Sequence, residues 1–394
     1  MSRRARRTTA QRPQPVSSRT LFIAALLALV IVTVAVLGVP AGFWRQPGPA
    51  SFRQELLVSL GLATPEPEAT LPPGDQPWYQ VHFTTPIYPD DASRHHDGID
   101  GHLVQLIDEA HKSVDVAAYE LDLQTVADAL VRARQRGVSV RVVTDSDNLS
   151  EDAIRSLQEA GIPVRADERA AIMHDKFVVI DDIYVLTGSW NLTVNCTYRN
   201  NNNAIIIRSP DLARNYRAEF VEMFEQGQFG PRSPRNTPLP EVTVQGTRIE
   251  TYFSPEDNPA DAVARAVGGA RHSIRFMAFS FTDEALAQVM IERARAGVDV
   301  SGVIEKRGSE TGYGQLVPLR EAGIAVLPDG NPYVMHHKVI IIDEETVITG
   351  SYNLTGSAAR DNDENLLIIH NPEIARLYLE EYERVRQVAA QAEP

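Results

Sequence analysis

The sequence contains two copies of one pattern, 162 residues apart, and this repeat constrains the fold more than any other feature. The first copy runs from His174 to Asp181 and the second from His336 to Asp343, and each reads His-x-Lys, an apolar run and an aspartate. A second block, Thr-Gly-Ser-x-Asn-Leu-Thr, follows each copy and is identical at six of its seven positions. The repeat predicts two halves with the same fold, and 394 residues suffice for two domains of ordinary size.

The segments around the two motifs repeat as well. In each half an amphipathic helix ends at a glycine and leads into a strand rich in β-branched residues, and a second helix and a short strand follow before the motif. The matching pairs are 122–136 and 283–296 for the first helix, 138–143 and 298–304 for the strand, and 151–160 and 317–322 for the second helix. Alternating helices and strands of this kind predict an α/β fold in which helices cover a largely buried sheet.

Composition shifts divide the remainder of the chain. Prolines concentrate between residues 40 and 79 and again between 231 and 240, which is typical of semi-rigid connecting segments. The predicted organisation is a basic cytoplasmic tail (1–20), a transmembrane anchor (21–39), a Pro-rich stalk (40–79), a first domain (80–230), a Pro-rich linker (231–246) and a second domain (247–388).

The anchor is predicted from residues 21–39, which contain no charged residue and as a helix would span about 28 Å, close to the thickness of the hydrocarbon core. Six arginines and no acidic residue precede this run, so the positive-inside rule favours a cytoplasmic N-terminus and a single-pass protein with an extracytoplasmic body. The alternative is a cleaved signal peptide, with a body that is secreted.

Charge and cysteine content restrict the function. The net charge is -14, and outside the arginine tail 32 basic residues face 52 acidic ones, a balance of -20 that disfavours tight non-specific binding of polyanions. Cys196 is the single cysteine, so neither an intrachain disulfide nor a Cys-based zinc site can form. His95-His96 and His336-His337 lack further ligands at metal-binding spacing, and we expect no metal and no cofactor.

Strand geometry predicts which motif residues meet. Residues i and i+2 share a face of a strand, so His174 and Lys176 point together, as do His336 and Lys338. Asp181 and Asp343 lie at odd spacing from the histidines and are therefore predicted to be structural rather than acid–base groups. The same parity relates the motif serines to the motif asparagines, and these pairs are Ser189 with Asn191 and Ser351 with Asn353.

These residue types suit a phosphate group. Lysine supplies positive charge, and serine and asparagine supply neutral donors for anionic oxygens. Histidine can act as a nucleophile or a proton donor near neutral pH. Two such sets would provide one histidine to attack phosphorus and a second to protonate the leaving oxygen.

The paired blocks resemble the phospholipase D superfamily, and the resemblance covers roughly residues 80–388. It implies two tandem phospholipase D-like α/β domains related by a pseudo-two-fold axis, one shared cleft, a phosphohistidine intermediate and no metal. The resulting assignment makes seven residues catalytic, namely His174, Lys176, Asn191, His336, Lys338, Asn353 and Glu364. Ser189 and Ser351 are assigned to substrate binding, and no obligate protein partner is needed because both motifs lie in one chain.

Glu364 enters through the resemblance, because family members are similar to one another in an acidic residue that orients the catalytic imidazole. The equivalent position of the first half is Asn202, a departure from the pattern. A carboxylate raises imidazole basicity more than an amide does, which points to His336 as the better-supported base. Family precedent points to His174 as the nucleophile, so the order stays open with a lean to His174.

The leading hypothesis is a membrane-anchored phosphodiesterase that cleaves or transfers a phospholipid headgroup. The alternatives are a metal-independent nuclease of the same superfamily, a cardiolipin-synthase-like phosphatidyltransferase and an inactive, membrane-tethered binding module. Glu120 and Ser280 occupy matching positions after a strand in the two halves. Lining of the pocket is one alternative for them, and packing or surface exposure is the expected role.

Overall fold

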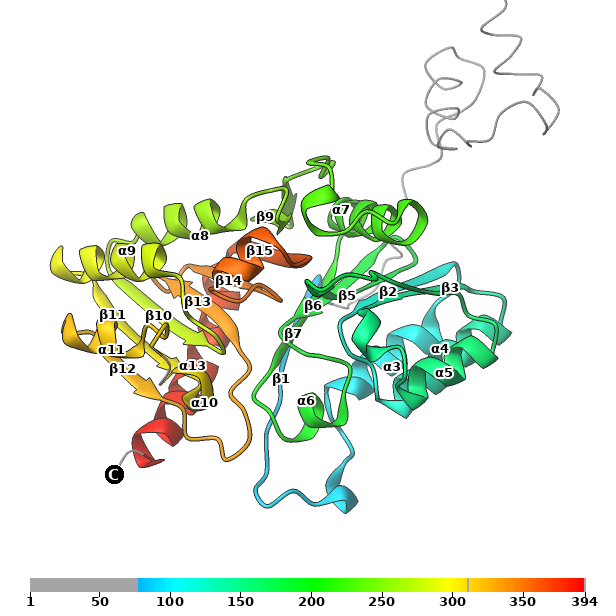
Figure 1. Cartoon of the computed structure of the whole chain (residues 1–394), viewed down its shortest axis with the longest axis horizontal. Helices are drawn as coiled ribbons and strands as arrows, with labels where there is room; N and C mark the ends of the chain where they lie inside the picture. The colour runs from blue at the N-terminus through cyan, green and yellow to red at the C-terminus, as the bar shows by residue number, and fades with distance from the viewer. Residues whose placement is uncertain (1–76, 310–311, 393–394) are drawn as a thin grey trace, which may run out of the picture. The chain divides into compact units, whose positions relative to one another are not determined.

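The computed structural model describes residues 77–309 and 312–392, and residues from 75 onward belong to one compact unit. The unit contains two mixed α/β halves that lie side by side (Figure 1). The predicted tail and anchor, and the stalk up to residue 76, lie outside the described residues. Among the helices that are described, none combines the length and the apolar character needed to cross a membrane.

The first half is built on a seven-stranded sheet with the strand order β1-β7-β6-β5-β2-β3-β4. Its strands are β1 (Tyr79–Phe83), β2 (Ser113–Ala118), β3 (Ser139–Thr144), β4 (Val164–Ala166), β5 (Lys176–Ile180), β6 (Tyr184–Gly188) and β7 (Asn203–Arg208). Its helices are α3 (Ile99–Glu109), α4 (Gln124–Gln135), α5 (Asp152–Glu159), α6 (Val194–Tyr198) and α7 (Pro210–Val221). Strands β2, β3 and β4 pair in parallel, and the other neighbours are antiparallel.

The second half repeats this topology and adds one edge strand, in the order β12-β11-β10-β13-β14-β15-β9-β8. Its strands are β8 (Glu241–Val244), β9 (Thr247–Ser254), β10 (Ser273–Ala278), β11 (Asp299–Ile304), β12 (Ala325–Pro328), β13 (Lys338–Ile342), β14 (Thr346–Gly350) and β15 (Glu364–His370). Its helices are α8 (Pro259–Gly268), α9 (Glu284–Arg295), α10 (Lys306–Ser309), α11 (Leu316–Glu321), α12 (Gly356–Arg360) and α13 (Pro372–Ala392).

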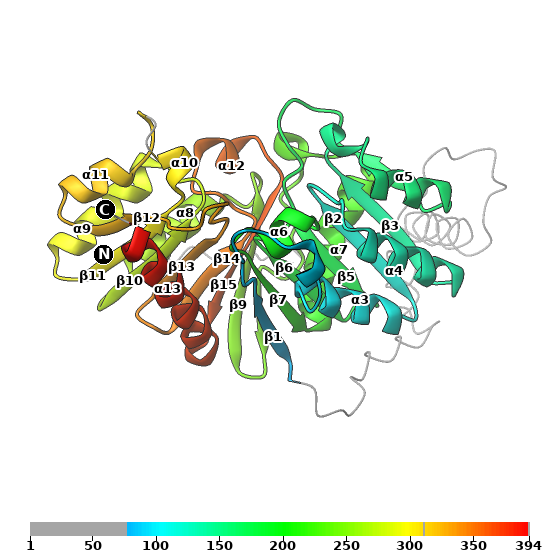
Figure 2. The same cartoon turned by 90° about the horizontal axis from the view of Figure 1, so that it is seen from below.

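The core has three parts, which together explain why the central strands are apolar on both faces. One cluster packs α3, α4 and α5 on the outer face of the first sheet, and a second packs α8, α9 and α11 on the outer face of the second sheet. A third cluster lies between the inner faces of the two sheets and includes residues of α7 and α13. Figure 2 shows α4 and α5 at one end of the molecule and α9 and α11 at the other.

The predicted helices and strands agree with the structure to within two residues at most ends, and the predicted linker differs in one respect. Residues 241–244 of the segment assigned to the linker form β8, which pairs with β9 across a turn at Gln245 and Gly246. Both turn residues have positive φ, 48° and 82°, as a two-residue hairpin of the favoured hand requires. Val242 is buried by this pairing, so the stretch folds as an edge strand rather than an exposed connection.

Candidate active site

The two motifs lie side by side because each motif histidine is held by backbone from the other half. The amide of His174 donates to the carbonyl oxygen of Asp363 at 2.9 Å, and the amide of His336 donates to that of Asn201 at the same distance. Both histidines are buried, at 5% and 7% exposure. The structure thus brings together the two half-sites that the sequence repeat predicts.

The partners of the imidazoles are exchanged between the halves. His174 Nδ1 lies 2.7 Å from Oε2 of Glu364, a residue of the second half. His336 Nδ1 lies 3.0 Å from Oδ1 of Asn202 and 3.1 Å from the carbonyl oxygen of Ser189, both in the first half. The interpretation that Glu364 supports His336 is therefore wrong. The carboxylate orients His174, whose Nε2 has no hydrogen-bond partner within the described ranges.

The motif serines hold these partners in place. Ser189 Oγ donates to Asn202 Oδ1 at 2.9 Å, and Ser351 Oγ donates to Glu364 Oε2 at 2.7 Å. Both serines are fully buried. The expectation was that the serine hydroxyls contact the substrate. Each hydroxyl instead donates its hydrogen bond to the residue that contacts the imidazole.

The glycines before these serines permit the close approach of neighbouring strands. Gly188 and Gly350 have φ values of 148° and 147°, and a Cβ atom at either position would lie 2.3 Å from a backbone carbonyl oxygen, that of Asn203 or Asn365. A larger residue would push β7 or β15 away. The glycine is therefore required by the strand spacing.

The motif lysines lie beside the histidines, as strand parity predicts. Lys176 Nζ donates to the carbonyl oxygen of His174 at 2.7 Å, and Lys338 Nζ donates to that of His336 at 3.0 Å. Lys338 Nζ also lies 3.1 Å from His336 Nε2, so in the free site this ring nitrogen is an acceptor. No corresponding contact joins Nε2 of His174 to Lys176 among the described residues.

Two aromatic residues that the sequence analysis missed line the site. Tyr119 packs edge-on against His174 with ring centroids 5.2 Å apart, and Phe279 packs against His336 at 4.6 Å. The ammonium groups of Lys176 and Lys338 lie 5.2 Å and 4.8 Å from the same two rings. The signal was present in the sequence, since these aromatics stand at matching positions directly after β2 and β10.

The motif asparagines lie at the edge of the site. Asn191 Nδ2 is 3.4 Å from a carboxylate oxygen of Glu120, and Glu120 interacts electrostatically with Lys176. The Oδ1 atoms of Asn191 and Asn353 are buried and have no hydrogen-bond partner among the described residues. Glu120 thus lies half-buried beside the first motif, and the second half has Ser280 in its place.

The motif aspartates have the structural role that parity predicts. Each lies in a hairpin turn with positive φ, 55° for Asp181 and 53° for Asp343. The Asp181 carboxylate accepts hydrogen bonds from the backbone amides of residues 111–113, and Asp343 accepts from those of 271–273. Both aspartates fasten the hairpin to the start of the neighbouring strand, away from the imidazoles.

Burial and charge tune the site for an anion. Burial, reinforced by the lysines, holds the pKa of His174 and of His336 well below 6.5, so both imidazoles are neutral at neutral pH. Burial lowers the pKa of Lys176 to about 8 and raises that of Glu364, while each of these two groups favours the charged form of the other. A bound phosphodiester would compensate the two buried lysines and favour their charged forms.

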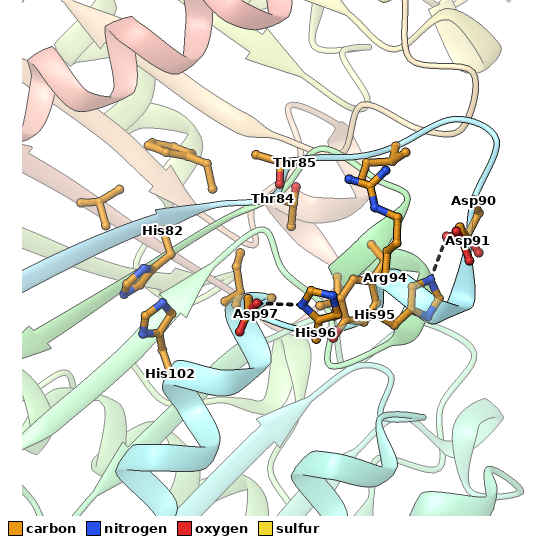
Figure 3. Close-up of a pocket in the computed structure, with 17 residues that line it drawn as sticks. His82, Thr84, Thr85, Asp90, Asp91, Arg94, His95, His96, Asp97 and His102 are labelled. Carbon is orange, nitrogen blue, oxygen red and sulfur yellow. Dashed lines mark hydrogen bonds and ion pairs between the residues drawn. The ribbon is translucent and has the colours of Figure 1, made fainter.

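A separate cavity of about 410 Å³ lies between β1, α3 and α6 and includes the His95-His96 pair (Figure 3). His95 is bound to Asp90 at 2.8 Å and His96 to Asp97 at 2.7 Å. No motif residue lines this cavity. Within the described ranges, one group of three acidic side chains has metal-binding spacing, and it includes neither this histidine pair nor a motif residue.

Comparisons with known proteins agree with this geometry. The family described as "Cardiolipin synthase, PLD-like domain" matches residues 103–224 and 263–386, one segment in each half. The chain therefore belongs to the phospholipase D superfamily, a family of phosphodiesterase-type enzymes.

Two curated relatives carry more specific names. A "Phospholipase D" of Rickettsia bellii is 31% identical over 37% of this chain and 76% of its own length. A "Mitochondrial cardiolipin hydrolase" of Xenopus tropicalis is 34% identical over 34% of this chain and 64% of its own length.

Two solved structures are similar to parts of this chain. The phosphatidylserine synthase of Haemophilus influenzae covers 79% of this chain and 86% of its own length, with a TM-score of 0.55 and 16% sequence identity. Nuc of Salmonella typhimurium, a phospholipase D family member, is 34% identical, with a TM-score of 0.35, over 36% of this chain and 95% of its own. The first of these likenesses supports the fold with two halves in one chain.

Proposed function

We propose that this protein cleaves or transfers the headgroup of a phospholipid through a covalent phosphohistidine on His174. The observation that carries the proposal is the buried pair of His174 Nδ1 and Glu364 at 2.7 Å, which leaves Nε2 of the same ring without a partner beside two lysines. A carboxylate on Nδ1 fixes the tautomer in which Nε2 carries the lone pair.

In the first step, His174 Nε2 attacks phosphorus, a P–N bond forms, and the P–O bond to the leaving alcohol breaks. His336 donates its Nε2 proton to the departing oxygen, and the negative charge of the bound phosphodiester favours the protonated imidazole that this requires. In the second step, water or an acceptor alcohol gives its proton to His336 and attacks phosphorus. The P–N bond then breaks and His174 returns to its starting form.

Lys176 and Lys338 neutralise the charge that develops on the equatorial oxygens, and Asn191 and Asn353 offer further polar groups to the substrate. No step in this scheme uses a metal ion. The names of the curated relatives, together with the acidic body, favour a phospholipid over a nucleic acid as the substrate class.

The segment 21–39 supports a membrane location for this activity, with the body outside the cytoplasm. Protease added to intact spheroplasts should then digest the body. Full protection of the body after this treatment would contradict the topology.

The substrate class is tested by incubating the full-length protein with labelled phosphatidylcholine, phosphatidylglycerol and single-stranded DNA in parallel. We expect release or exchange of a lipid headgroup, and no product with a His174→Asn variant that folds normally. Cleavage of DNA with both lipids left intact would assign a nuclease instead. The absence of any product from all three substrates would favour a binding module.

A further inference from the structure

Three glutamates outside the active site form a compact group at the end of α7. Glu219 lies in the last turns of α7, Glu222 begins the π-helical turn η3 (Glu222–Gln226), and Glu256 follows β9. Each offers a carboxylate oxygen, and the three oxygens lie within 4.8 Å of one another. Glu219 and Glu222 face the same direction because they are three residues apart on a helix.

The group is buried and lacks a counter-ion. Glu219 and Glu222 are 4% and 1% exposed. Oε1 of Glu222 and both carboxylate oxygens of Glu256 are buried without a hydrogen-bond partner, and none of the three residues forms an ion pair with any described residue. Burial and the charge of nearby carboxylates raise the pKa of Glu222 to about 7 and that of Glu256 to about 8. Charged carboxylates in such a place are costly unless a cation compensates them.

In the second half, the glutamate at the position that corresponds to Glu219 is paired with a histidine and an arginine. Glu381 of α13 stands 162 residues after Glu219, the offset that relates the two motifs. Its Oε1 lies 2.9 Å from His337 Nε2, and both of its oxygens accept from Arg384, at 2.6 and 2.7 Å. Glu381 is therefore compensated by a histidine and an arginine.

In the first half, acidic residues stand at the positions that correspond to His337 and Arg384. Asp175 stands at the position of His337, and Glu222 stands at the position of Arg384, whereas the central glutamate is retained as Glu219. Asp175 is fully buried, and its Oδ2 has no hydrogen-bond partner among the described residues. Its charge also acts on Glu219. Two hydrogen-bond donors to the glutamate of one half thus correspond to two acids in the other, where no described residue forms an ion pair with Glu219.

We infer that Glu219, Glu222 and Glu256 bind a divalent cation, with Ca²⁺ as the best match. All the available ligand atoms are oxygens, which hard cations prefer. Oxygens that lie within 4.8 Å of one another can converge on one ion. Ca²⁺ accepts irregular sets of oxygen ligands at about 2.3–2.6 Å, whereas Mg²⁺ demands near-ideal octahedral geometry and keeps several waters, so Ca²⁺ suits a group of three carboxylates better.

The cation has a structural role. It joins the end of α7 to the loop after β9, which belongs to the second sheet, at the place where the chain passes from one half to the other. Asn236 of the Pro-rich segment donates to the remaining oxygen of Glu222 at 3.2 Å, so the connecting segment is fastened to the same group. Among the described residues, no hydrogen bond or ion pair joins the three glutamates to a motif histidine or lysine, so the proposed cation site is distinct from the candidate catalytic one.

The test is thermal unfolding of the full-length protein in detergent, first stripped with EDTA and then titrated with CaCl₂, MgCl₂ or MnCl₂. We expect Ca²⁺ at about a hundred times its dissociation constant to raise Tm by about 5 °C. Glu222→Gln should abolish this shift. Asp211→Asn, which removes an exposed carboxylate from the same helix, should leave it unchanged.

A second variant keeps the test informative if Glu222→Gln folds poorly. Glu222→Arg copies the second half, so it should have a higher Tm than the wild type in EDTA and no response to Ca²⁺. Calorimetry should give one Ca²⁺ per wild-type chain and none for this variant. If none of the three cations changes the Tm of the wild type, the proposed site is wrong. The same holds if Ca²⁺ raises the Tm of Glu222→Arg as much as that of the wild type.

The competing explanation for the buried glutamate cluster is that its carboxylates share protons and bind no cation. Since the folded-state pKa values of these acids are raised, protonation would stabilise the protein at low pH, and Tm would fall as the pH rises through about 7 to 8. That fall, with no response to Ca²⁺ at pH 8, would assign the cluster to proton sharing.

Discussion

At the scale of single residues, the decisive feature is that each imidazole is oriented by a residue from the opposite half. Glu364 contacts Nδ1 of His174, and Asn202 contacts Nδ1 of His336. A carboxylate stabilises positive charge on the ring that it contacts, whereas an amide accepts a neutral hydrogen bond and does not. The departure at position 202 therefore makes the two histidines chemically different, and the difference favours His174 as the nucleophile.

The assignment of the nucleophile predicts where a covalent adduct forms. An activated phosphodiester with a nitrophenolate leaving group needs no general acid, so wild type and His336→Asn should both become modified on His174. The His174→Asn variant should form no adduct. Mass spectrometry of the quenched proteins measures this directly, and an adduct on His336 would reverse the proposed roles.

Glu364→Gln should lower turnover by about 10- to 100-fold, the usual effect of losing a carboxylate that orients an imidazole, judged by analogy with metal sites. Asn202→Ala should cost less, because a neutral acceptor is lost and the Ser189 carbonyl oxygen still contacts His336. Steady-state kinetics of both variants test the order. Equal losses would show that the two partners are equivalent.

The lysines predict the pH dependence of kcat/KM. Protonated lysine is the active form, and because burial lowers the pKa of Lys176 to about 8 and lowers that of Lys338 as well, kcat/KM should fall as the pH rises through about 8. The charge of Glu364 raises both lysine pKa values, so Glu364→Gln should move this limb to lower pH. A profile that stays flat to pH 9.5 would contradict the prediction. The acid limb should lie below 6.5, where His174 gains a proton.

At the scale of helices and strands, much of the fold was predictable from sequence. The helix at 122–136 and its repeat at 283–296 were found because apolar periodicity and a terminal glycine mark them, and the structure has α4 and α9 there. Strand β5 was found from the apolar run after Lys176. Edge strand β8 was missed because its four residues adjoin a Pro-rich segment that hides the alternation.

The exchange of imidazole partners could not be predicted in the same way. Glu364 begins β15, and its hydrogen bond with Ser351 follows from the pairing of β14 and β15 within one sheet. Its contact with His174 depends on how the two sheets face each other, which no local pattern encodes. The spacing of the motifs identifies the residues of the site. Which residue contacts which imidazole is determined only by the tertiary arrangement.

The close approach of β6 and β7 predicts that Gly188→Ala is destabilising. A methyl group there would lie 2.3 Å from the carbonyl oxygen of Asn203, in a backbone conformation with φ of 148°, so we expect a loss of at least about 2 kcal/mol in the free energy of unfolding. Gly101→Ala is the control, because its site on α3 is open and exposed and the change should be neutral or stabilising. Denaturant unfolding compares them, and similar midpoints for the two variants would refute the steric argument.

At the scale of the whole molecule, the two halves form one folded unit around a shared core. Buried residues of both sheets, α7 and α13 belong to a single apolar cluster. Polar contacts also cross between the halves, since Thr349 donates to Asn203 at 2.9 Å and Thr187 donates to Asn365 at 2.5 Å. One chain thus supplies both halves of the site, and we expect the shared core, rather than the connection at 231–240, to position them.

Cutting this connection should therefore leave the enzyme intact. A recognition sequence for a specific protease, inserted after the exposed residue Arg235, would allow the folded protein to be cleaved between the halves. We expect the two fragments to co-elute in gel filtration and to retain most of the uncut activity, because the buried core and the His174–Glu364 pair do not depend on chain continuity. The uncut insertion variant and a cleaved His174→Asn variant serve as controls for the insertion and for background turnover. Separation of the fragments without denaturant would show that the shared core is too weak to hold the site together. Co-elution with complete loss of turnover would show that the connection itself aligns the histidines.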